Sequence, residues 1–540
     1  MTPCRRLRPS QPFATRAAIA LALPLLLLLS CASGAPGGDG EDGAAKKKKR
    51  TVLVTEYDDL DLGNEAAREI EAELGLYESK ELLEYVTQVG RRLVQHAPLR
   101  PFQYSFKILD QMAPNAFSIP GGHIYVSRGL LALANSEDEL ANVLGHEIIH
   151  AADRHVAAQQ ELARRTNPFT LPFLRMARLA AYSRDHERAA DRGGQILAAK
   201  AGYDPAGMSE FLKHLGDSER FILGYSRLIS YFDTHPGTTE RVSSTAARAM
   251  TIEWSSDPTW VVEPGTYLRR IDGIVLETDP AEGLFRGNEF VHPDLDFRIL
   301  FPRGWELVNT HQAVGAMSPD GRARFFLTLE APKKPEKADG ADAASDPSGE
   351  DEADGPPPEM PTPREAAERF VAEHGNDYRV RVRSEQPVQL GDIVAYRLEI
   401  EGRMGVTAIA GHVTFIPHGG FVFRLTSVAV SGSWDQYQGR AHTMARTFRG
   451  LTDEERSSVE VLHLRLARAL DGEDIAALSQ RTGNVWPPGR TAVLNGVFVD
   501  RRFEEGDLVK IARASKYVPK RPAGAKPGNT QDVLGGPGGS

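Results

Sequence analysis

Apolar residues between positions 65 and 93 recur at helical spacing, with charged residues between them. They are Ile70, Leu74, Leu82, Leu83, Val86, Val89 and Leu93. Apolar positions three and four residues apart share one face of a helix, so this pattern predicts amphipathic helices. A helical pattern resumes at Arg128, while residues 103–109 and 123–126 predict short strands, the second after a Pro-Gly-Gly turn signal. We therefore expect a mainly α-helical domain over residues 52–280.

After residue 285 the pattern changes to apolar runs that predict strands with a helix or two. These runs cover residues 297–301, 325–329, 394–400, 408–415 and 420–428. The expected accessory α/β domain, 285–451, is interrupted by a Pro-, Asp- and Ala-rich stretch, 332–363, whose composition predicts a disordered insertion. A last compact unit spans 459–514, and a Pro/Gly-rich tail, 515–540, is expected to be disordered. The fold class is thus multidomain α+β, without an internal repeat.

The N-terminus has the layout of a targeting segment. Four arginines precede an apolar run that ends at Leu28-Leu29-Ser30-Cys31, which resembles a bacterial lipobox. The run has signal-peptide length and is too short to span a bilayer comfortably. We therefore expect a signal peptide over 1–30, a lipid on Cys31 and a flexible tether over 31–51. The alternative is ordinary cleavage near Ala32 or Ala35, which leaves Cys31 as a free thiol.

The cysteine count favours lipidation of Cys31. The chain has two cysteines, and Cys4 leaves with the leader, so the mature chain cannot form an internal disulfide. No later run is long and apolar enough to cross a membrane. Ala32, rather than Asp, follows Cys31 and favours the outer membrane under enterobacterial sorting rules. The expected location is the bacterial periplasm, as a lipoprotein anchored to a membrane, with the outer membrane favoured.

The charge distribution argues against a nucleic-acid partner. The formal net charge is −9, but residues 333–360 hold nine acids and three lysines, a local balance of −6. The remaining chain is nearly balanced and has no basic footprint for nucleic acid. A hydrophobic content of 41% is ordinary for globular domains.

The candidate chemistry starts at His146-Glu147-Ile148-Ile149-His150. Ser136 and Glu139 resemble a capping box at the start of the helix that carries this motif. Two histidines four residues apart share a helix face, so both imidazoles can bind one zinc ion. Glu147 then lies where it can take the proton of a metal-activated water as general base.

A second helical segment, 183–193, supplies a third candidate ligand. Glu187 and Asp191 are four residues apart and share a face. Glu187 can ligate the metal, and Asp191 can accept the spare N–H of a zinc-bound histidine. By itself the segment also fits an exposed charged helix with i, i+4 pairs. His155 and His186 are expected to lie off the ligand face.

These motifs, together with the stretch 115–126, resemble metallopeptidase family forty-eight, the gluzincin group that contains CAAX prenyl endopeptidases, HtpX and periplasmic BepA-type proteases. The resemblance covers about residues 52–249. It implies a zincin-like fold with His146, His150 and Glu187 as ligands of one Zn²⁺ and Glu147 as base. It also implies that strand 123–126 is the edge along which an extended substrate is laid. The lack of membrane spans favours the soluble periplasmic branch.

The segment Asp233-Thr234-His235-Pro236, followed by Arg241, resembles the family's T-H-P…R segment. His235 has three alternatives: a fourth ligand that closes the site, a hydrogen-bond donor to the transition state, or a structural turn residue. Arg241 either stabilises an oxyanion or pairs with a carboxylate. Asn115 and His123 are further candidates for oxyanion or substrate contacts.

The two remaining modules carry weaker resemblances. Residues 297–305 look like the opening of small PsbP-like α/β domains. Residues 464–478 and 494–511 resemble a LysM repeat, a βααβ fold that binds peptidoglycan glycans. The usual Gly-Asp-Thr-Leu is replaced by Gly472-Glu473-Asp474-Ile475, so the alternatives are cell-wall binding and a degenerate structural version.

The leading hypothesis is a zinc-dependent endopeptidase of the bacterial cell envelope that cleaves unfolded or mis-assembled polypeptides. The alternative is a latent zinc-bearing chaperone or scaffold, anchored to the membrane through Cys31 and to the cell wall. A zinc hydrolase that acts on cell-wall amides is a third hypothesis, which rests on the LysM resemblance alone.

Overall fold

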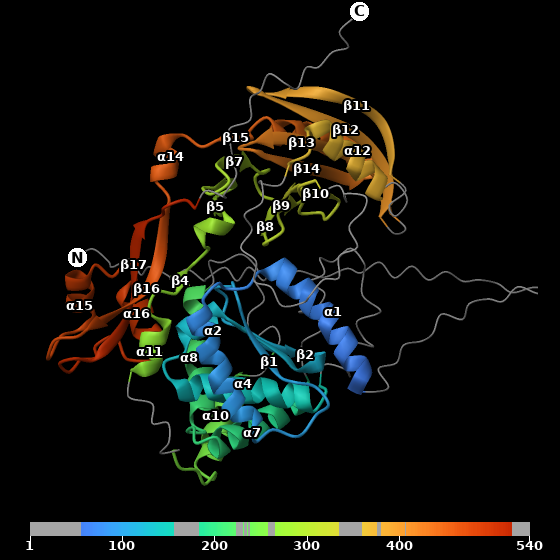
Figure 1. The fold of residues 1–540 in the computed structure, drawn as a ribbon. Coiled ribbons are helices and arrows are strands. Elements are labelled where there is room, and N and C mark those ends of the chain that lie inside the picture. The colour runs from blue at the N-terminus through green and yellow to red at the C-terminus, as the bar shows by residue number, and fades with distance from the viewer. Residues whose placement is uncertain are drawn as a thin grey trace, which may run out of the picture. The chain divides into compact units, whose positions relative to one another are not determined.

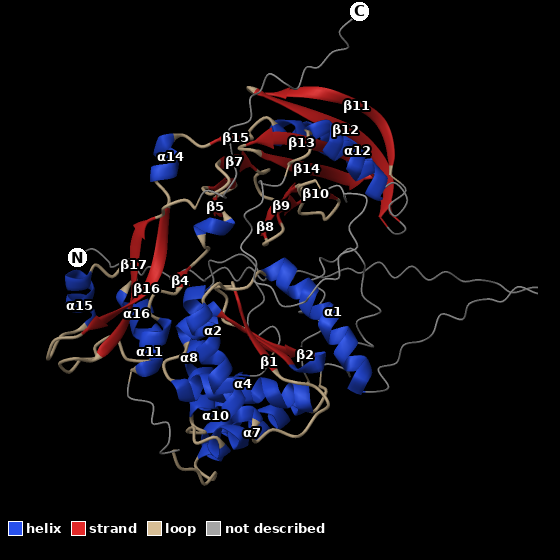
Figure 2. Cartoon of the chain, in the orientation of Figure 1, coloured by secondary structure: helices blue, strands red, loops and turns tan. Residues whose placement is uncertain are grey.

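The computed structural model describes residues 56–155, 183–222, 231, 235, 238–256, 265–333, 359–374, 380–404 and 407–520. The chain divides into two compact units, Met1–Thr51 and Val52–Ser540, and every described residue belongs to the second. The predicted signal peptide, Cys31 and the tether lie outside the described residues. Figures 1 and 2 label the elements of the second unit.

The first part of this unit is mainly helical, as the periodicity predicts. Its helices are α1 (Glu56–Leu74), α2 (Lys80–Val94), α3 (Arg128–Leu133), α4 (Glu137–Ala152), α7 (Arg184–Lys200), α8 (Gly207–Ile222), α10 (Thr238–Ala249) and α11 (Thr266–Ile271). Within the described ranges, no helix is long and apolar enough to cross a membrane.

A three-stranded sheet accompanies these helices. It consists of β1 (Ser105–Leu109), β2 (Ala116–Ile119) and β3 (His123–Ser127) in the order β1-β3-β2. Strand β3 pairs with β1 in parallel and with β2 in antiparallel orientation, so both of its edges are occupied. The prediction that strand 123–126 offers a substrate edge is therefore wrong. The edge strand that contacts helix α4 is β2.

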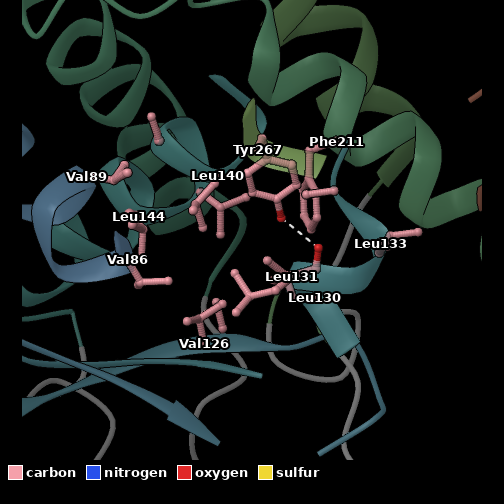
Figure 3. Packing of buried hydrophobic residues seen from close by; sticks show 14 of the residues in the cluster. Val86, Val89, Val126, Leu130, Leu131, Leu133, Leu140, Leu144, Phe211 and Tyr267 are labelled. Carbon is pink, nitrogen blue, oxygen red and sulfur yellow. Dashed lines mark hydrogen bonds between the residues drawn. The ribbon is translucent and has the colours of Figure 1, made fainter. Parts of the chain in front are cut away.

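Helix α4 carries the histidine motif and is buried along nearly its whole length. Figure 3 shows Leu140 and Leu144 of α4 among apolar side chains from α2, α3 and β3. At its start, the Ser136 hydroxyl accepts a hydrogen bond from Glu139 N (3.1 Å), as predicted. The Glu139 carboxylate accepts from Asn135 N (3.2 Å), one residue before the cap, so the reciprocal bond of the capping box is displaced. A capped, buried helix holds the motif in place.

The accessory domain is built mainly from antiparallel strands. A seven-stranded sheet has the order β11-β12-β13-β14-β10-β9-β8, and a four-stranded sheet the order β15-β7-β6-β5. Apolar residues on the larger sheet form one core with helix α13 and another with helix α12. The elements are β5 (Leu284–Arg286), β6 (Glu289–His292), β7 (Phe297–Leu300), β8 (Glu306–Asn309), β9 (Ala313–Met317), β10 (Ala323–Leu329), α12 (Pro363–His374), β11 (Arg381–Leu390), β12 (Ile393–Met404), β13 (Thr407–His418), β14 (Phe421–Val430), α13 (Trp434–Ala445), β15 (Arg449–Gly450) and α14 (Asp453–Ser457).

The predicted insertion 332–363 lies partly outside the described residues. Its first two and last five residues are described, and helix α12 begins at Pro363. Lys333 N donates to Glu359 O (2.8 Å), which brings the two described ends together.

The C-terminal segment runs β16 (Glu460–Arg468), α15 (Ile475–Thr482), α16 (Pro488–Leu494) and β17 (Leu508–Lys516). This is the strand–helix–helix–strand order, while its assignment as a LysM repeat stays a prediction. β16 also pairs with β4 (Val275–Leu276), which precedes the accessory domain in the chain. Tyr517 N donates to Val459 O (2.9 Å) and the described chain continues to residue 520. The predicted disordered tail therefore starts too early.

The C-terminal segment shares a core with the helical domain. Leu464, Trp486 and Ala512 belong to the same buried cluster as the apolar residues of α4. The ammonium of Lys510 is fully buried and donates to the carbonyl oxygens of Ala132, Leu133 and Ala134 (2.9, 2.9 and 3.1 Å). These carbonyls lie at the end of α3, where helical partners are lacking.

We expect the substitution Lys510→Met to lower the free energy of unfolding by about 1–3 kcal/mol, because it leaves buried carbonyls without donors. Burial lowers the pKa of Lys510 to about 7, but three acceptors match the three N–H bonds of the protonated ammonium. Urea unfolding of the full chain measures the effect. Lys516→Met, at the exposed end of the same strand, should leave the free energy of unfolding unchanged. Equal midpoints for both variants would contradict the prediction.

Candidate metal centre

Two helices that pack unusually closely bring the predicted ligands together. Helix α4 carries His146 and His150, and helix α7 carries Glu187. At their contact, a Cβ on Gly145 would lie 2.9 Å from Gly194 O, and a Cβ on Gly194 would lie 2.6 Å from His146 N. Because only glycine avoids these clashes, the two helices can approach closely enough for side chains on both to reach one point.

The candidate ligand atoms form a compact buried group. His146, His150, Glu187 and His235 each offer one nitrogen or oxygen, and these atoms all lie within 4.8 Å of one another. His150 Nε2 lies 2.9 Å from His146 Nε2 and 3.3 Å from Glu187 Oε1. Glu187 Oε2 lies 3.7 Å from His146 Nε2. The structure therefore brings together the three ligands predicted from the sequence.

His235 joins this group as a fourth member. Its Nδ1 lies 3.0 Å from Glu187 Oε1 and 3.3 Å from His146 Nε2. Its Nε2 lies 3.3 Å from Ala116 O on the edge strand β2 and 3.4 Å from Glu147 Oε1. Of the three alternatives for His235, this position supports the fourth ligand most directly.

The donor set fits a zinc ion. Ligand atoms at about 2.0–2.1 Å from a tetrahedral zinc lie about 3.3 Å apart. The five distances given above between pairs of ligand atoms range from 2.9 to 3.7 Å, and all four atoms lie within 4.8 Å of one another. Three imidazole nitrogens and one carboxylate oxygen are also the ligand types that zinc selects. Burial and the neighbouring His146 both lower the pKa of His150. Its imidazole is therefore neutral at pH 7, as ligation requires.

Asp191 and Arg241 contact the ligand side chains without belonging to the ligand group. Asp191 Oδ1 lies 2.9 Å from His146 Nδ1, the ring nitrogen opposite the ligand atom. Arg241 binds Asp191 with two nitrogens (2.7 and 2.9 Å) and Glu187 with a third (2.7 Å). Burial raises the pKa of Asp191, but Arg241 and His146 together outweigh it and hold the pKa at about 2. For Arg241, this geometry supports pairing with carboxylates rather than contact with an oxyanion.

Glu147 lies beside the ligand group without belonging to it. Its side chain is fully buried, and neither carboxylate oxygen has a hydrogen-bond partner among the described residues. Burial raises the pKa of Glu147. The electrostatic attraction of His235 lowers this pKa, but by less than burial raises it. A carboxylate whose pKa moves toward neutrality is a better proton acceptor than an ordinary surface glutamate.

His155 is a supporting residue that helical spacing misses. Helix α4 ends at Ala152, and Arg154 adopts a left-handed conformation (φ 53°). His155 N then donates to His150 O and Arg154 N to Ala151 O (3.1 and 3.3 Å), the two bonds of a Schellman turn. This turn brings His155 Nδ1 to 3.0 Å from His150 Nδ1. His155 is therefore placed to fix the orientation of the His150 ring.

His186 and the two substrate-contact candidates have other neighbours. The His186 ring stacks on His155 with centroids 4.2 Å apart. His123 contacts Ser105 Oγ (3.0 Å) and Asn64 Oδ1 (3.1 Å) with its two ring nitrogens, so both are already engaged. Asn115 is buried, and its backbone N donates to Ser127 Oγ (2.9 Å). The structure thus places none of the side chains of His186, His123 and Asn115 in the ligand group.

Comparisons with known proteins agree with this site. Residues 81–249 match Peptidase family M48. The chain is 28% identical over 215 residues to the Beta-barrel assembly-enhancing protease of Yersinia pestis, which covers 35% of this chain and 44% of that protein. It is 27% identical over 215 residues to the Escherichia coli K12 protein of the same name, with the same coverage. It is 27% identical over 175 residues to the Mitochondrial metalloendopeptidase OMA1 of Schizosaccharomyces pombe. This match covers 29% of this chain and 50% of that protein.

The chain spans half or less of the length of these relatives. Among solved structures, it is similar to the solution structure of cyanobacterial PsbP from Synechocystis sp. PCC 6803. That similarity has 12% sequence identity and a TM-score of 0.23, and covers 31% of this chain and 95% of that chain.

Proposed function

Because residues 81–249 form a domain of Peptidase family M48, we propose that this chain is a zinc-dependent endopeptidase that cleaves unfolded or mis-assembled proteins in the bacterial envelope. The observation that carries the proposal is the buried group of His146, His150 and Glu187 with Glu147 beside it. The names of the relatives from Yersinia and Escherichia support the envelope and the quality-control role.

The residues of the site divide the chemistry between them. When bound, zinc supplies a Lewis acid that polarises the scissile carbonyl and lowers the pKa of water. Glu147 takes one proton from the attacking water as the water oxygen bonds to the carbonyl carbon. Glu147 then passes that proton to the leaving amine nitrogen as the C–N bond breaks. Asp191 holds the His146 ring in one orientation during both steps.

The edge strand β2 is the proposed place for the substrate backbone. β2 contacts helix α4, and Ala116 O of this strand lies 3.3 Å from His235 Nε2. An extended peptide that pairs with an edge strand gains main-chain hydrogen bonds with little dependence on side chains. That mode of binding suits a protease whose substrates share a lack of structure rather than a sequence.

Metal removal tests the proposal. The mature full chain should contain one zinc per molecule and digest an unfolded protein such as casein. Treatment with a chelator should abolish digestion, and stoichiometric zinc should restore it. Digestion that persists in a metal-free preparation would reject the proposal.

The second candidate function is a latent zinc-bearing chaperone or scaffold. It is favoured by the burial of all four ligand side chains and of Glu147, and by the position of His235 as a fourth ligand. A fourth protein ligand occupies the position that a catalytic zinc site leaves open. In this state a peptide carbonyl has no access to the metal.

We expect His235→Ala to increase casein digestion about tenfold, if removal of the fourth ligand raises the competent form from roughly a tenth of the molecules to nearly all. Zinc content should remain one per chain, because three ligands are kept. His311→Ala, which removes a half-exposed histidine near Glu282, is the matched control. A loss of activity would favour His235 as a transition-state donor, and no activity in either form would favour the scaffold.

The proposed location depends on Cys31 and the C-terminal segment. We propose a lipid on Cys31 that anchors the chain to a membrane of the periplasm, with the outer membrane favoured, and a C-terminal segment that contacts peptidoglycan. Cys31→Ser should release the chain from the membrane fraction without loss of casein digestion. Co-sedimentation with purified sacculi tests the second contact separately.

A further inference from the structure

A group of basic side chains outside the metal centre lies on the accessory domain, where helix α13 packs against the seven-stranded sheet. We call it the basic cluster, and it consists of Arg397 on β12, His412 on β13, His442 on α13 and Arg446 at the end of α13. These residues come from three elements that are separated in the sequence. Their arrangement is therefore a product of the fold and not of a local charge run.

The contacts within the basic cluster are specific. The rings of His412 and His442 stack with centroids 4.9 Å apart and an interplanar angle of 14°. Arg446 follows His442 by one helical turn, so both lie on the same side of α13. On the sheet, Arg397 pairs in register with Thr414 and donates from Nε to its hydroxyl (3.0 Å).

The basic cluster has no acidic partner among the described residues. None of its four members forms an ion pair with a described carboxylate. The nearest acid by register is Glu399, opposite His412, but Glu399 accepts a hydrogen bond from Ser384 (2.9 Å) and its charge acts on Arg383. Like charges gathered without a counter-ion cost free energy, so such a cluster indicates a binding site for an anion.

The buried floor of the basic cluster contains an unused polar atom. His412 is 6% exposed, and its Nδ1 has no hydrogen-bond partner among the described residues. Ser427 lies directly opposite His412 on β14 and is also buried. A buried ring nitrogen without a partner is unfavourable in a folded protein, unless a ligand supplies that partner.

The electrostatics of the cluster agree with this geometry. Burial, Arg397 and His442 together lower the pKa of His412 to about 4. Burial and the two arginines also lower the pKa of His442. Burial is the larger cause of both shifts and the neighbouring arginines add to it, so both histidines are neutral at pH 7. The repulsion that an anion would relieve is the one between Arg397 and Arg446.

A structural role explains only part of the cluster. Arg446 lies at the C-terminal end of α13, where a cation is favourable to the helix dipole. That role does not account for Arg397, which is half-buried on a strand, or for the unpartnered nitrogen of His412.

We propose that the basic cluster binds a phosphate group. Two guanidinium groups, two imidazoles and the hydroxyl of Thr414 offer more donors than a carboxylate can accept, while a tetrahedral phosphate can use them. Free inorganic phosphate and the head group of an anionic lipid both present this chemistry, and the test below distinguishes them.

The test is calorimetric titration of the full chain with sodium phosphate, against sodium chloride at equal ionic strength. We expect saturable binding of one phosphate per chain. Arg446→Gln and Arg397→Gln should each weaken it by at least about 10-fold, since each removes a charge-assisted hydrogen bond. Arg440→Gln, on the same helix but over the Tyr437 ring, is the matched control and should leave the affinity unchanged.

A parallel flotation assay with phosphatidylglycerol vesicles distinguishes the two sources. Saturable phosphate binding that depends on Arg446 identifies a site for the free ion. Vesicle binding alone, lost in Arg446→Gln but not in Arg440→Gln, identifies a lipid head group. The proposal fails if neither ligand binds, or if the Arg440 and Arg446 variants lose affinity equally.

Discussion

The substitution Glu147→Gln should lower the rate of casein cleavage by about 10²–10⁴-fold, the contribution expected of a positioned general base. Glutamine has nearly the same shape as glutamate but cannot take a proton from water. Because Glu147 is fully buried and burial raises the pKa of its carboxyl, the neutral amide should not destabilise the fold. The measurement is the initial rate of digestion at equal zinc content.

Two controls make the Glu147 result specific. Glu240→Gln removes an exposed carboxylate that pairs with Arg188 and should leave the rate unchanged. Zinc content in Glu147→Gln should stay at one per chain, because Glu147 is not among the four candidate ligands. A variant that keeps more than a tenth of the activity would show that another group takes the proton.

The part of the metal centre that could be predicted from the sequence depends on helical spacing and on the resemblance to the metallopeptidase family. His146 and His150 share a face because they are four residues apart, and Glu187 and Asp191 share one for the same reason. The local periodicity of a helix fixes these relations wherever the helix lies in the fold. Spacing does not show that the two helices meet, which only the resemblance implies, and the structure brings all four residues together.

The errors arise where the local pattern ends. His155 lies outside the ligand group, as expected, but helical spacing gives no sign of its contact with His150 Nδ1, which depends on the left-handed turn at Arg154. The wrong prediction of strand 123–126 as a substrate edge comes from the family resemblance, and the sequence of the strand gives no sign of a partner on its second side. Its parallel pairing with β1 joins two strands that are separated in the sequence by β2, and such pairing has no local signal.

The union of the C-terminal segment with the helical domain was also beyond prediction. Lys510 looks like a surface lysine in the sequence, but it reaches carbonyls of residues 132–134, more than 370 positions earlier. A contact of this kind depends on how two segments pack, which composition and periodicity do not encode. Past residue 514 the chain continues its pairing with β16 and Tyr517 contacts Asp294, although Pro and Gly predict disorder there.

Arg241 is the buried counter-charge of two carboxylates in the site. It is 3% exposed and forms contacts of 2.7–2.9 Å with two buried carboxylates, Glu187 and Asp191. Burial alone would lower the pKa of Arg241, but Tyr231, Asp191 and Glu187 together raise it well above the ordinary value. Arg241 therefore remains charged, and both carboxylates remain ionised and ready to bind metal and to orient His146.

We expect Arg241→Leu to lower the free energy of unfolding by about 3–5 kcal/mol, because it leaves two carboxylates buried without their counter-charge. The loss should be larger in the metal-free chain than in the zinc-loaded chain, since bound zinc compensates Glu187 but not Asp191. Urea unfolding with and without zinc measures both values. Arg188→Leu breaks an exposed pair with Glu240 and should leave the midpoint unchanged. If both variants unfold alike, Arg241 does not hold the site together.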